Sequence, residues 1–471
     1  MIFLVHLLNK KTEKMHIKNK RNLLVIMLAL GIFTSCQKKI DTPSTNPVPT
    51  PTPVSTAEDK IKDTTLSYAR DIYLWYNQIP SSLNPRSFAD PDAIMKGIRP
   101  YSMEAGFPNP VDRFSFAMKQ VDWNNLSSGS SDDFGFSIFF LNSSDLRVKY
   151  VERDAPAGKA GIQRGWRIIK INGSSNIATD QATINTIVDA IFHSKTTSFT
   201  FQKPDGSNVD LTLNAAPYQT HPIMVDSVYT INSKKIGYMV FNSFLGSTTE
   251  INSEFSRVFS RFSSYGVNDV VIDLRYNGGG YVSIAEKLSN FLAPSSVTGS
   301  TMMTQQYNDK YAAKYNVTTK FNKEGSINLP RVFFIVSSGT ASASELVINN
   351  LKAVMDVKLI GRNSTYGKPV GFFPIPVGDW YIFPVSFKTV NKNGTSDYYT
   401  GFAPDAIVAD GLDKNWGDIT ETSLASAIKY ITTGAFRLAS QPSYQEQPQV
   451  TNGNSILDEN TFKGTVSGKK R

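Results

Sequence analysis

The sequence predicts a multidomain α/β protein, and three features lead to that class. The chain has 471 residues, enough for two or three domains with a sizeable core. Residues 217–435 alternate apolar runs typical of buried strands with stretches of helical spacing, as in a sheet covered on both faces. Residues 59–120 show helical spacing alone, whereas residues 133–216 alternate short strands with turns. We therefore expect a small helical domain, a β-rich module and a larger α/β domain.

The charge distribution argues against a nucleic-acid-binding protein. The formal net charge is +9. Residues 1–35 carry six basic side chains against one acidic one, and residues 38–39 and 469–471 add five more basic side chains. The body between these ends is therefore close to neutral, and no nucleic-acid partner is expected.

Residues 1–35 predict a signal peptide. The run LLVIMLALGIF at residues 23–33 follows several basic residues and is too short to span a bilayer, which takes ~20 residues. Cys36, the single cysteine, comes directly after this segment. That placement resembles the lipobox of bacterial lipoproteins, in which the cysteine is acylated; the alternative is an ordinary secretory signal with a cysteine nearby. Residues 36–58 are rich in proline and threonine and predict an extended tether. We expect a protein of the bacterial cell envelope, lipid-anchored at the outer membrane, on its periplasmic side or at the cell surface.

The helical domain is expected to begin near residue 59. Leu66, Ala69, Tyr73 and Tyr76 recur at helical spacing, and Pro80 ends the pattern. A second, short helix is expected after Asp90, a good N-cap residue.

The β-rich module at residues 133–216 resembles a PDZ domain. Residues 155–173 match its short helix, glycine-capped turn and following strand, and residues 182–193 would form its longer helix. In PDZ domains a glycine-bearing loop binds the terminal carboxylate of a peptide that adds as a strand. Phe134, Gly135 and Phe136 match that loop. The alternative is a structural module that binds no peptide.

The α/β domain contains four expected buried strands and two long helices. The strands are expected at residues 236–241, 267–274, 331–337 and 357–360, and the helices at 249–265 and 343–355.

Two segments that follow these strands could carry chemistry. Three glycines, Gly278 to Gly280, let the backbone approach a ligand and present N–H groups to it. The Lys-Ser/Thr pair of a phosphate-binding loop does not follow them, so a loop that stabilises an oxyanion fits better. Ser342 lies at a strand-to-helix junction, where the free amides of a helix N-terminus favour negative charge. Such a junction suits a serine nucleophile with an oxyanion hole, although a simple serine-rich helix cap is the alternative.

A lysine is the candidate base for such a nucleophile. The chain has four histidines, two of them in residues 1–35, so no zinc site is expected, and a Ser-His-Asp triad requires His193 or His221 beside the serine. Lys368 follows Ser342 by 26 residues. To act as a base its pKa must fall from ~10.4 to perhaps 7–8, which requires a desolvated site. Phe372 is one residue that could supply an apolar wall.

Together these motifs resemble the C-terminal processing, or tail-specific, serine peptidases. The resemblance covers residues 59–430 and rests on Asp-Leu-Arg-x-Asn-x-Gly-Gly at 273–280, Thr-Ala-Ser-Ala-Ser-Glu at 340–345 and Gly-Lys at 367–368, with supporting motifs at 74–76, 112–115 and 402–405. It implies a crotonase-like α/β peptidase domain that needs no cofactor or metal.

The resemblance also implies roles for single residues. Ser342 would be the nucleophile and Lys368 the general base, and the amides of Ala343 and one of Gly278 or Gly279 would form the oxyanion hole. Some family members carry a glutamine four residues after the lysine, where this chain has Phe372.

We therefore interpret the chain as a serine endopeptidase of the bacterial envelope, with protein or peptide substrates recognised through their C-termini. The alternative is a catalytically inactive, peptide-binding PDZ lipoprotein. Residues 436–471, rich in Gln, Ser and Asn, are expected to form a polar tail.

Overall fold

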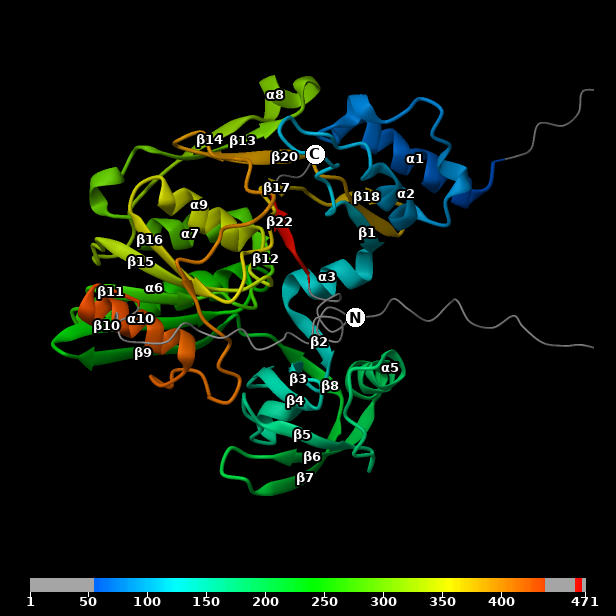
Figure 1. The fold of residues 1–471 in the computed structure, drawn as a ribbon. Coiled ribbons are helices and arrows are strands. Elements are labelled where there is room, and N and C mark those ends of the chain that lie inside the picture. Colours follow the sequence, from blue (N-terminus) through cyan, green and yellow to red (C-terminus); the bar gives the residue numbers. More distant parts are fainter. Residues whose placement is uncertain (1–54, 437–461, 468–471) are drawn as a thin grey trace, which may run out of the picture. The chain divides into compact units, whose positions relative to one another are not determined.

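The computed structural model describes residues 55–436 and 462–467 (Figure 1). The predicted signal peptide, Cys36 and most of the predicted tether lie outside the described residues. The described residues from Ala57 onward form one compact unit. No helix in the described part of the chain is long and apolar enough to cross a membrane.

The first segment contains two helices as expected, although the first ends at Ile72 instead of continuing through Tyr76, and one strand that was not expected. Its elements are α1 (Ala57–Ile72), η1 (Tyr76–Gln78), η2 (Pro85–Ser87), α2 (Pro91–Ile98) and β1 (Phe116–Lys119). Asp90 caps α2 by accepting a hydrogen bond of 2.8 Å from the Ala93 amide, as predicted. β1 lies at the end of the predicted helical domain, yet it pairs with β19 (Trp380–Phe383), more than 250 residues later in the sequence. Such a long-range partner cannot be read from a local pattern.

The β-rich module is an antiparallel sheet with the strand order β3-β4-β5-β6-β7. Its strands and helices share one core, which includes Phe136, Ile138 and Ile187. The expected long helix is formed by α5 and continues as a π-helical turn, η3. β3 lies at one edge of the sheet. A peptide can add to a sheet as a further strand only at such an edge strand. The elements are α3 (Gln120–Ser128), β2 (Ser130–Asp133), β3 (Phe136–Asn142), β4 (Asp145–Val151), α4 (Pro156–Lys159), β5 (Arg167–Ile171), α5 (Gln181–Val188), η3 (Asp189–His193), β6 (Thr196–Gln202), β7 (Asn208–Asn214) and β8 (Ala216–Gln219).

A six-stranded sheet of order β21-β16-β15-β11-β10-β9 forms the centre of the α/β region. All neighbours are parallel except β9 and β10. Side chains of β10, β11, β15 and β16 enter two different cores, one shared with α6, α7 and α9 and the other with α10, so helices cover both faces (Figure 1). The four expected strands and two expected helices are confirmed. The elements are β9 (Ile223–Ile231), β10 (Lys234–Phe241), α6 (Thr248–Ser264), β11 (Asp269–Asp273), α7 (Val282–Leu292), β15 (Arg331–Val336), α9 (Ala343–Lys352), β16 (Asp356–Gly361), β21 (Ala406–Ile407) and α10 (Thr422–Thr433).

Smaller sheets connect these parts. β14-β13-β20-β17 form a four-stranded sheet, β1-β19-β18 a three-stranded one, and β12 pairs with β22. The remaining elements are β12 (Gly279–Tyr281), η4 (Ser295–Val297), β13 (Thr301–Tyr307), α8 (Asp309–Tyr315), β14 (Val317–Lys320), β17 (Val370–Gly371), β18 (Ile375–Val377), β20 (Phe387–Asn391) and β22 (Gly464–Val466).

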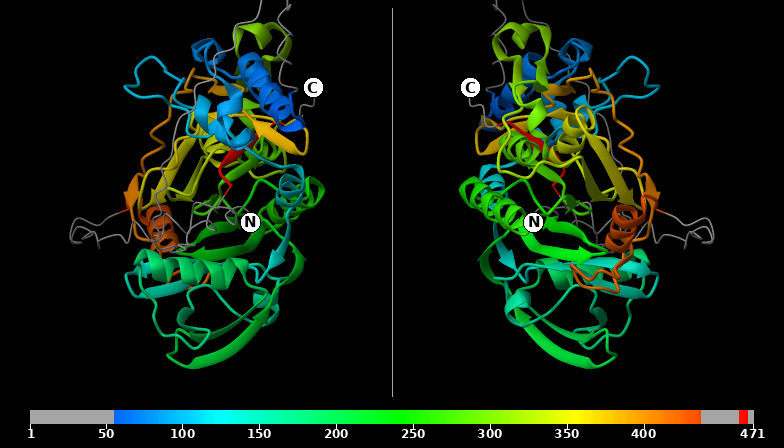
Figure 2. Two further views of the ribbon diagram at one scale, coloured as in Figure 1. Left: turned by 90° about the vertical axis from the view of Figure 1, so that its right-hand side faces the viewer. Right: turned by 90° about the vertical axis from the view of Figure 1, so that its left-hand side faces the viewer.

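The interpretation of residues 436–471 as a polar tail is wrong for residues 462–467. These residues include β22, which runs parallel to β12 and is the red strand among the yellow and green elements in Figures 1 and 2. Val466 is 2% exposed and packs in a cluster with Trp123, Phe372 and Phe383. Residues 436–471 are polar as a whole, and only Phe462 and Val466 are large apolar residues in this short segment, so composition did not predict a strand there.

Candidate active site

Ser342 lies in a strained turn between β15 and α9. Its φ is +63° and its ψ is −108°, a conformation that residues other than glycine rarely adopt. Strain of this kind persists only where the surrounding structure enforces it, and it concentrates at functional sites. The turn places Ser342 directly before the first amide of α9, as the strand-to-helix prediction required.

The buried carboxylate of Glu345 enforces this turn and joins it to the lysine segment. It accepts hydrogen bonds from the amides of Ser342 (2.8 Å), Gly367 (2.6 Å) and Lys368 (2.8 Å) and from the hydroxyl of Thr365 (2.6 Å). Burial raises the pKa of Glu345, and these hydrogen bonds oppose that rise. Glu345 is the last residue of the 340–345 motif, but the motif alone did not predict a role for it. Its position three residues after a helix N-cap was the available signal.

Lys368 is buried in an apolar pocket. It is 1% exposed, and its Nζ lies 3.7 Å from the centroid of the Phe372 ring and 5.2 Å from that of Phe114. Desolvation lowers the pKa of Lys368 well below its ordinary value, although the negative charges of Asp112 and Glu345 oppose the shift. The predicted apolar wall at Phe372 is confirmed, and Phe114 is a second wall that sequence reasoning missed.

Phe114 is placed by the motif at residues 112–115. The Asp112 carboxylate accepts hydrogen bonds from the Phe114 amide (2.8 Å) and from the hydroxyl of Tyr73 (2.7 Å), a residue that directly follows α1. Arg113 donates to the carbonyl groups of Tyr366 and Tyr399. The helical segment therefore contributes directly to the lysine pocket. The Tyr366 ring lies 4.7 Å from the Arg113 guanidinium and 6.0 Å from the Phe114 ring, a packing role.

The backbone amides predicted to form the oxyanion hole differ in whether they already donate a hydrogen bond within the protein. The Gly279 amide donates to Asn277 Oδ1 at 2.9 Å, so it is already used. Ala343 provides the first amide of α9, which has no intrahelical acceptor. A Cβ added to Gly279 would lie 2.9 Å from the Ala343 nitrogen, so the glycine loop and the helix terminus are adjacent. Of the two alternatives left open by the sequence, we retain the Gly278 amide beside that of Ala343 as the predicted oxyanion hole.

A buried ionic network holds the glycine loop at its start. The Arg275 side chain donates to Asp273 (2.7 Å), Asp410 (2.7 Å) and Glu421 (2.9 Å). Arg164 of the β-rich module also donates to Asp410, at 2.6 Å. Every charge in the network is paired, as buried charges require. Glu421, the N-cap of α10, and Arg164 of the β-rich module thereby join the start of the glycine loop to both of these parts.

Residues 462–467 lie across both candidate catalytic side chains. The hydroxyl of Ser342 is hydrogen-bonded to that of Thr465, and Lys368 Nζ donates to the carbonyl of Lys463 at 3.1 Å. Among the described residues, no hydrogen bond joins Ser342 to Lys368. Each side chain instead contacts the same extended segment.

The two histidines outside the N-terminal segment are bound elsewhere. His221 is hydrogen-bonded to Glu250 and Asp154, each at 2.6 Å, and His193 to Asp189 at 2.9 Å. Neither contacts Ser342 within the described part of the chain, so a Ser-His-Asp triad is not formed there.

The predicted carboxylate-binding loop of the β-rich module is shaped by close packing. Gly135 has a φ of +77°, and a Cβ there would lie 1.9 Å from the Cβ of Ala155. Its amide donates to Asp133 Oδ1 at 2.6 Å. A peptide carboxylate would therefore have to displace the Asp133 carboxylate from the Gly135 amide. The side chains of Phe134 and Phe136 are buried in the module core.

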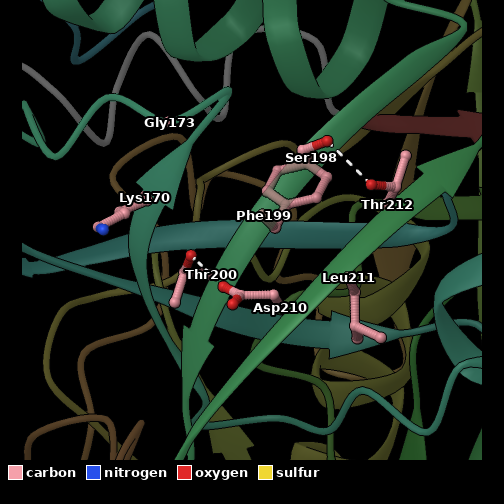
Figure 3. A pocket seen from close by; sticks show the side chains of 8 residues that line it. All are labelled: Lys170, Gly173, Ser198, Phe199, Thr200, Asp210, Leu211 and Thr212. Atoms are coloured by element: carbon pink, nitrogen blue, oxygen red, sulfur yellow. Dashed lines mark hydrogen bonds between the residues drawn. The ribbon is translucent and has the colours of Figure 1, made fainter.

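A separate hollow lies on the β5-β6-β7 part of the same module (Figure 3). Its lining mixes polar residues such as Lys170 and Asp210 with the apolar Phe199 and Leu211, and Ser198 and Thr212 are hydrogen-bonded to each other. None of the candidate catalytic or peptide-binding residues lines it.

Comparisons with known proteins match two segments of the chain. Residues 235–408 match the model of Peptidase family S41, and residues 60–116 match that of the Peptidase S41 N-terminal domain. These two matches give the chain an S41 peptidase fold. One matched segment contains Ser342 and Lys368, and the other contains Phe114.

The curated proteins that this chain resembles include processing proteases. The chain is 27% identical over 298 residues to the carboxy-terminal processing protease CtpA of Bacillus subtilis (strain 168), which covers 62% of this chain and 58% of CtpA. It is 26% identical over 260 residues to CtpB of the same organism, covering 54% of this chain and 50% of CtpB. The chain thus spans about half to three fifths of the length of these curated relatives. A Bacteroides fragilis NCTC 9343 structure assigned to the S41 proteases has a TM-score of 0.66 and 26% identity, covering 79% of this chain and 97% of that one.

Glu345→Ala tests the role of the shared carboxylate. The substitution leaves three buried amides and the Thr365 hydroxyl without their acceptor, and each orphaned donor costs about 1–3 kcal/mol. We expect the free energy of unfolding, measured by urea titration, to fall by about 4 kcal/mol or more. Glu58→Ala is the matched control, because the Glu58 side chain is 70% exposed, and it should change the stability by less than ~0.5 kcal/mol. Equal effects of the two substitutions would contradict the assignment.

Proposed function

We propose that this protein is a serine endopeptidase that cleaves protein substrates through Ser342 and Lys368. The observation that supports it best is the extended segment 462–467, which contacts both side chains. A groove that holds one peptide strand against a strained serine and a desolvated lysine suits peptide-bond hydrolysis.

The proposed reaction follows from the chemistry of the two groups. Desolvation lowers the pKa of Lys368 and so favours the neutral amine, which in this proposal accepts the proton of the Ser342 hydroxyl as the serine oxygen attacks the substrate carbonyl. The amides of Ala343 and Gly278 would stabilise the resulting oxyanion. The protonated lysine then gives its proton to the leaving amine, and water releases the acyl group by the same route. In this proposal the lysine has to turn from the carbonyl of Lys463 to Ser342 when a substrate enters.

We further propose that the β-rich module is a PDZ domain that selects substrates by their C-termini. The open edge of β3 and the Phe134–Gly135–Phe136 loop support strand addition. The Asp133 carboxylate on the Gly135 amide is the feature that a bound C-terminus would have to replace.

The proposed location is the bacterial envelope, with a lipid anchor on Cys36. It rests on the basic residues, the apolar run and the single cysteine of the N-terminal segment. The Pro/Thr-rich residues that follow would separate the folded part from the membrane.

An inactive peptide-binding lipoprotein is the second candidate. Two observations favour it: Phe372 stands where some relatives carry a glutamine, and each candidate catalytic side chain bonds the 462–467 segment. Retention of a desolvated lysine and a strained serine that contact the same segment favours the enzyme, because a binding protein needs neither.

Substitutions of the two candidate catalytic residues separate these candidates. Ser342→Ala, Lys368→Met and Lys368→Arg should each lower hydrolysis of a fluorogenic protein substrate at least a thousandfold, since none retains both a nucleophile and a neutral base. Fluorophosphonate labelling should be lost in Ser342→Ala.

Thermal unfolding is the control for these variants. The pKa of Lys368 is lower in the folded state than in the unfolded state, so the lysine costs stability below its unfolded pKa of ~10.4. Lys368→Met should therefore unfold at the same or a higher temperature at pH 7. Substantial turnover by Lys368→Met would reject the lysine as the base.

The PDZ proposal predicts dependence on a free carboxylate. Binding of the Ser342→Ala variant should be measured on an array of hexapeptides attached by their N-termini, each with a free and an amidated C-terminus. Hydrogen bonds to a charged acceptor contribute ~1.5–3 kcal/mol each. The bound peptides should therefore lose at least about tenfold in affinity on amidation. Equal binding of both forms would identify the module as structural.

The anchoring proposal predicts a change in fractionation. Cys36→Ser should move the protein from the membrane fraction to the soluble fraction, or leave it with its signal segment uncleaved, as seen by immunoblot and mass spectrometry. Ser35→Ala is the matched control and should leave the protein in the membrane fraction. A processed Cys36→Ser protein that stays with membranes would rule out lipidation as the anchor.

A further inference from the structure

We infer that residues 462–467 form a self-inhibitory strand, a segment of the same chain that occupies the peptidase groove and keeps Ser342 and Lys368 apart. The inference rests on the proposed function, because inhibition presupposes activity. It assigns a regulatory role to a segment that the active-site chemistry does not itself require.

The segment is held by backbone hydrogen bonds on two sides. On one side it runs parallel to β12, with the Gly464 amide donating to the Gly278 carbonyl at 2.9 Å. On the other side the Phe372 amide donates to the Thr465 carbonyl at 3.0 Å, and the Ser467 amide donates to the Phe372 carbonyl at 3.0 Å. The strand therefore closes a gap between the glycine loop and the segment that follows Lys368. A substrate strand would need the same backbone groups.

The side chains of the segment fit this groove closely. Gly464 lies against two aromatic rings, since a Cβ there would be 2.2 Å from Phe462 Cζ and 2.8 Å from Phe372 Cζ. The segment also packs closely against Gly278, where a side chain would not fit, because a Cβ on Gly278 would lie 1.8 Å from the Phe462 carbonyl oxygen. Val466 fills the apolar cluster that contains Trp123 and Phe383. The groove thus accepts glycine at one position and a small aliphatic residue two positions later.

The polar contacts make this occupied state unproductive. Lys368 Nζ donates to the Lys463 carbonyl, so the amine that should take the serine proton is directed at the strand. The Ser342 hydroxyl is bonded to the Thr465 side chain rather than to the base. The segment therefore acts as an inhibitor in this state, and a substrate has to displace it before the two groups can meet.

Fluorophosphonate labelling of Ser342 measures this inhibition directly. A chain ending after Thr461 should be labelled at least tenfold faster than the full chain, because the groove is open. Gly464→Val in the full chain should have the same effect, since the added side chain cannot fit between Phe462 and Phe372. Gly453→Val, the same substitution outside the strand, is the matched control and should label at the rate of the unchanged protein. A peptide of residues 461–468 added to the shortened chain should slow labelling at concentrations on the order of mM, the effective concentration of a tethered segment.

The outcomes separate this inference from the proposed function. Equal labelling rates for the full chain, the shortened chain and Gly464→Val would overturn the inference while leaving the peptidase intact. If none of the proteins is labelled, the proposed function fails, and docking is then measured by fluorescence anisotropy of a fluorescein-labelled 461–468 peptide with the shortened chain. Saturable binding that the Gly464→Val peptide loses would still support a docked strand, and absence of binding would reject it.

Discussion

The four hydrogen bonds accepted by Glu345 are the interaction on which the candidate site depends. One carboxylate ties the Ser342 turn at the start of α9 to the Gly367–Lys368 segment, which lies in the loop between β16 and β17. Without a common acceptor, the positive φ of Ser342 would cost about 1–3 kcal/mol with nothing to enforce it. The same carboxylate is buried, so its charge is tolerated only because all of these donors converge on it.

Burial of Lys368 is the second condition, and it is met by residues far apart in the sequence. Phe114 belongs to the N-terminal segment and Phe372 to the segment after the lysine, and the two rings enclose the amine. These two segments are joined by the pairing of β1 with β19. β1 begins shortly after Phe114, and β19 begins shortly after Phe372. The N-terminal helical region is thus part of the site rather than an appended domain, which accounts for a separate family match at residues 60–116 beside that at 235–408.

The sequence predicted what depends on local pattern. The buried strands β10, β11, β15 and β16 were evident from apolar runs, and Ser342 and Lys368 from motifs of fixed spacing. Sequence reasoning did not find the role of Glu345, because its acceptor function depends on where Gly367 folds back. It missed Phe114 and β22 for a similar reason: a single aromatic residue and a short strand in a polar stretch have no periodicity to reveal them. The choice between Gly278 and Gly279 also needed coordinates, since the amide of Gly279 is used by the neighbouring Asn277 side chain.

Desolvation can make Lys368 a base only if it lowers the pKa of this lysine, and that pKa can be measured. The chemical shifts of Lys 13Cε can be followed against pH in protein labelled at lysine, with Lys368→Arg identifying the signal. The account predicts a midpoint well below the ~10.4 of an exposed lysine. A midpoint near 10.4 would mean that Lys368 is charged at neutral pH, and it would contradict the proposed mechanism.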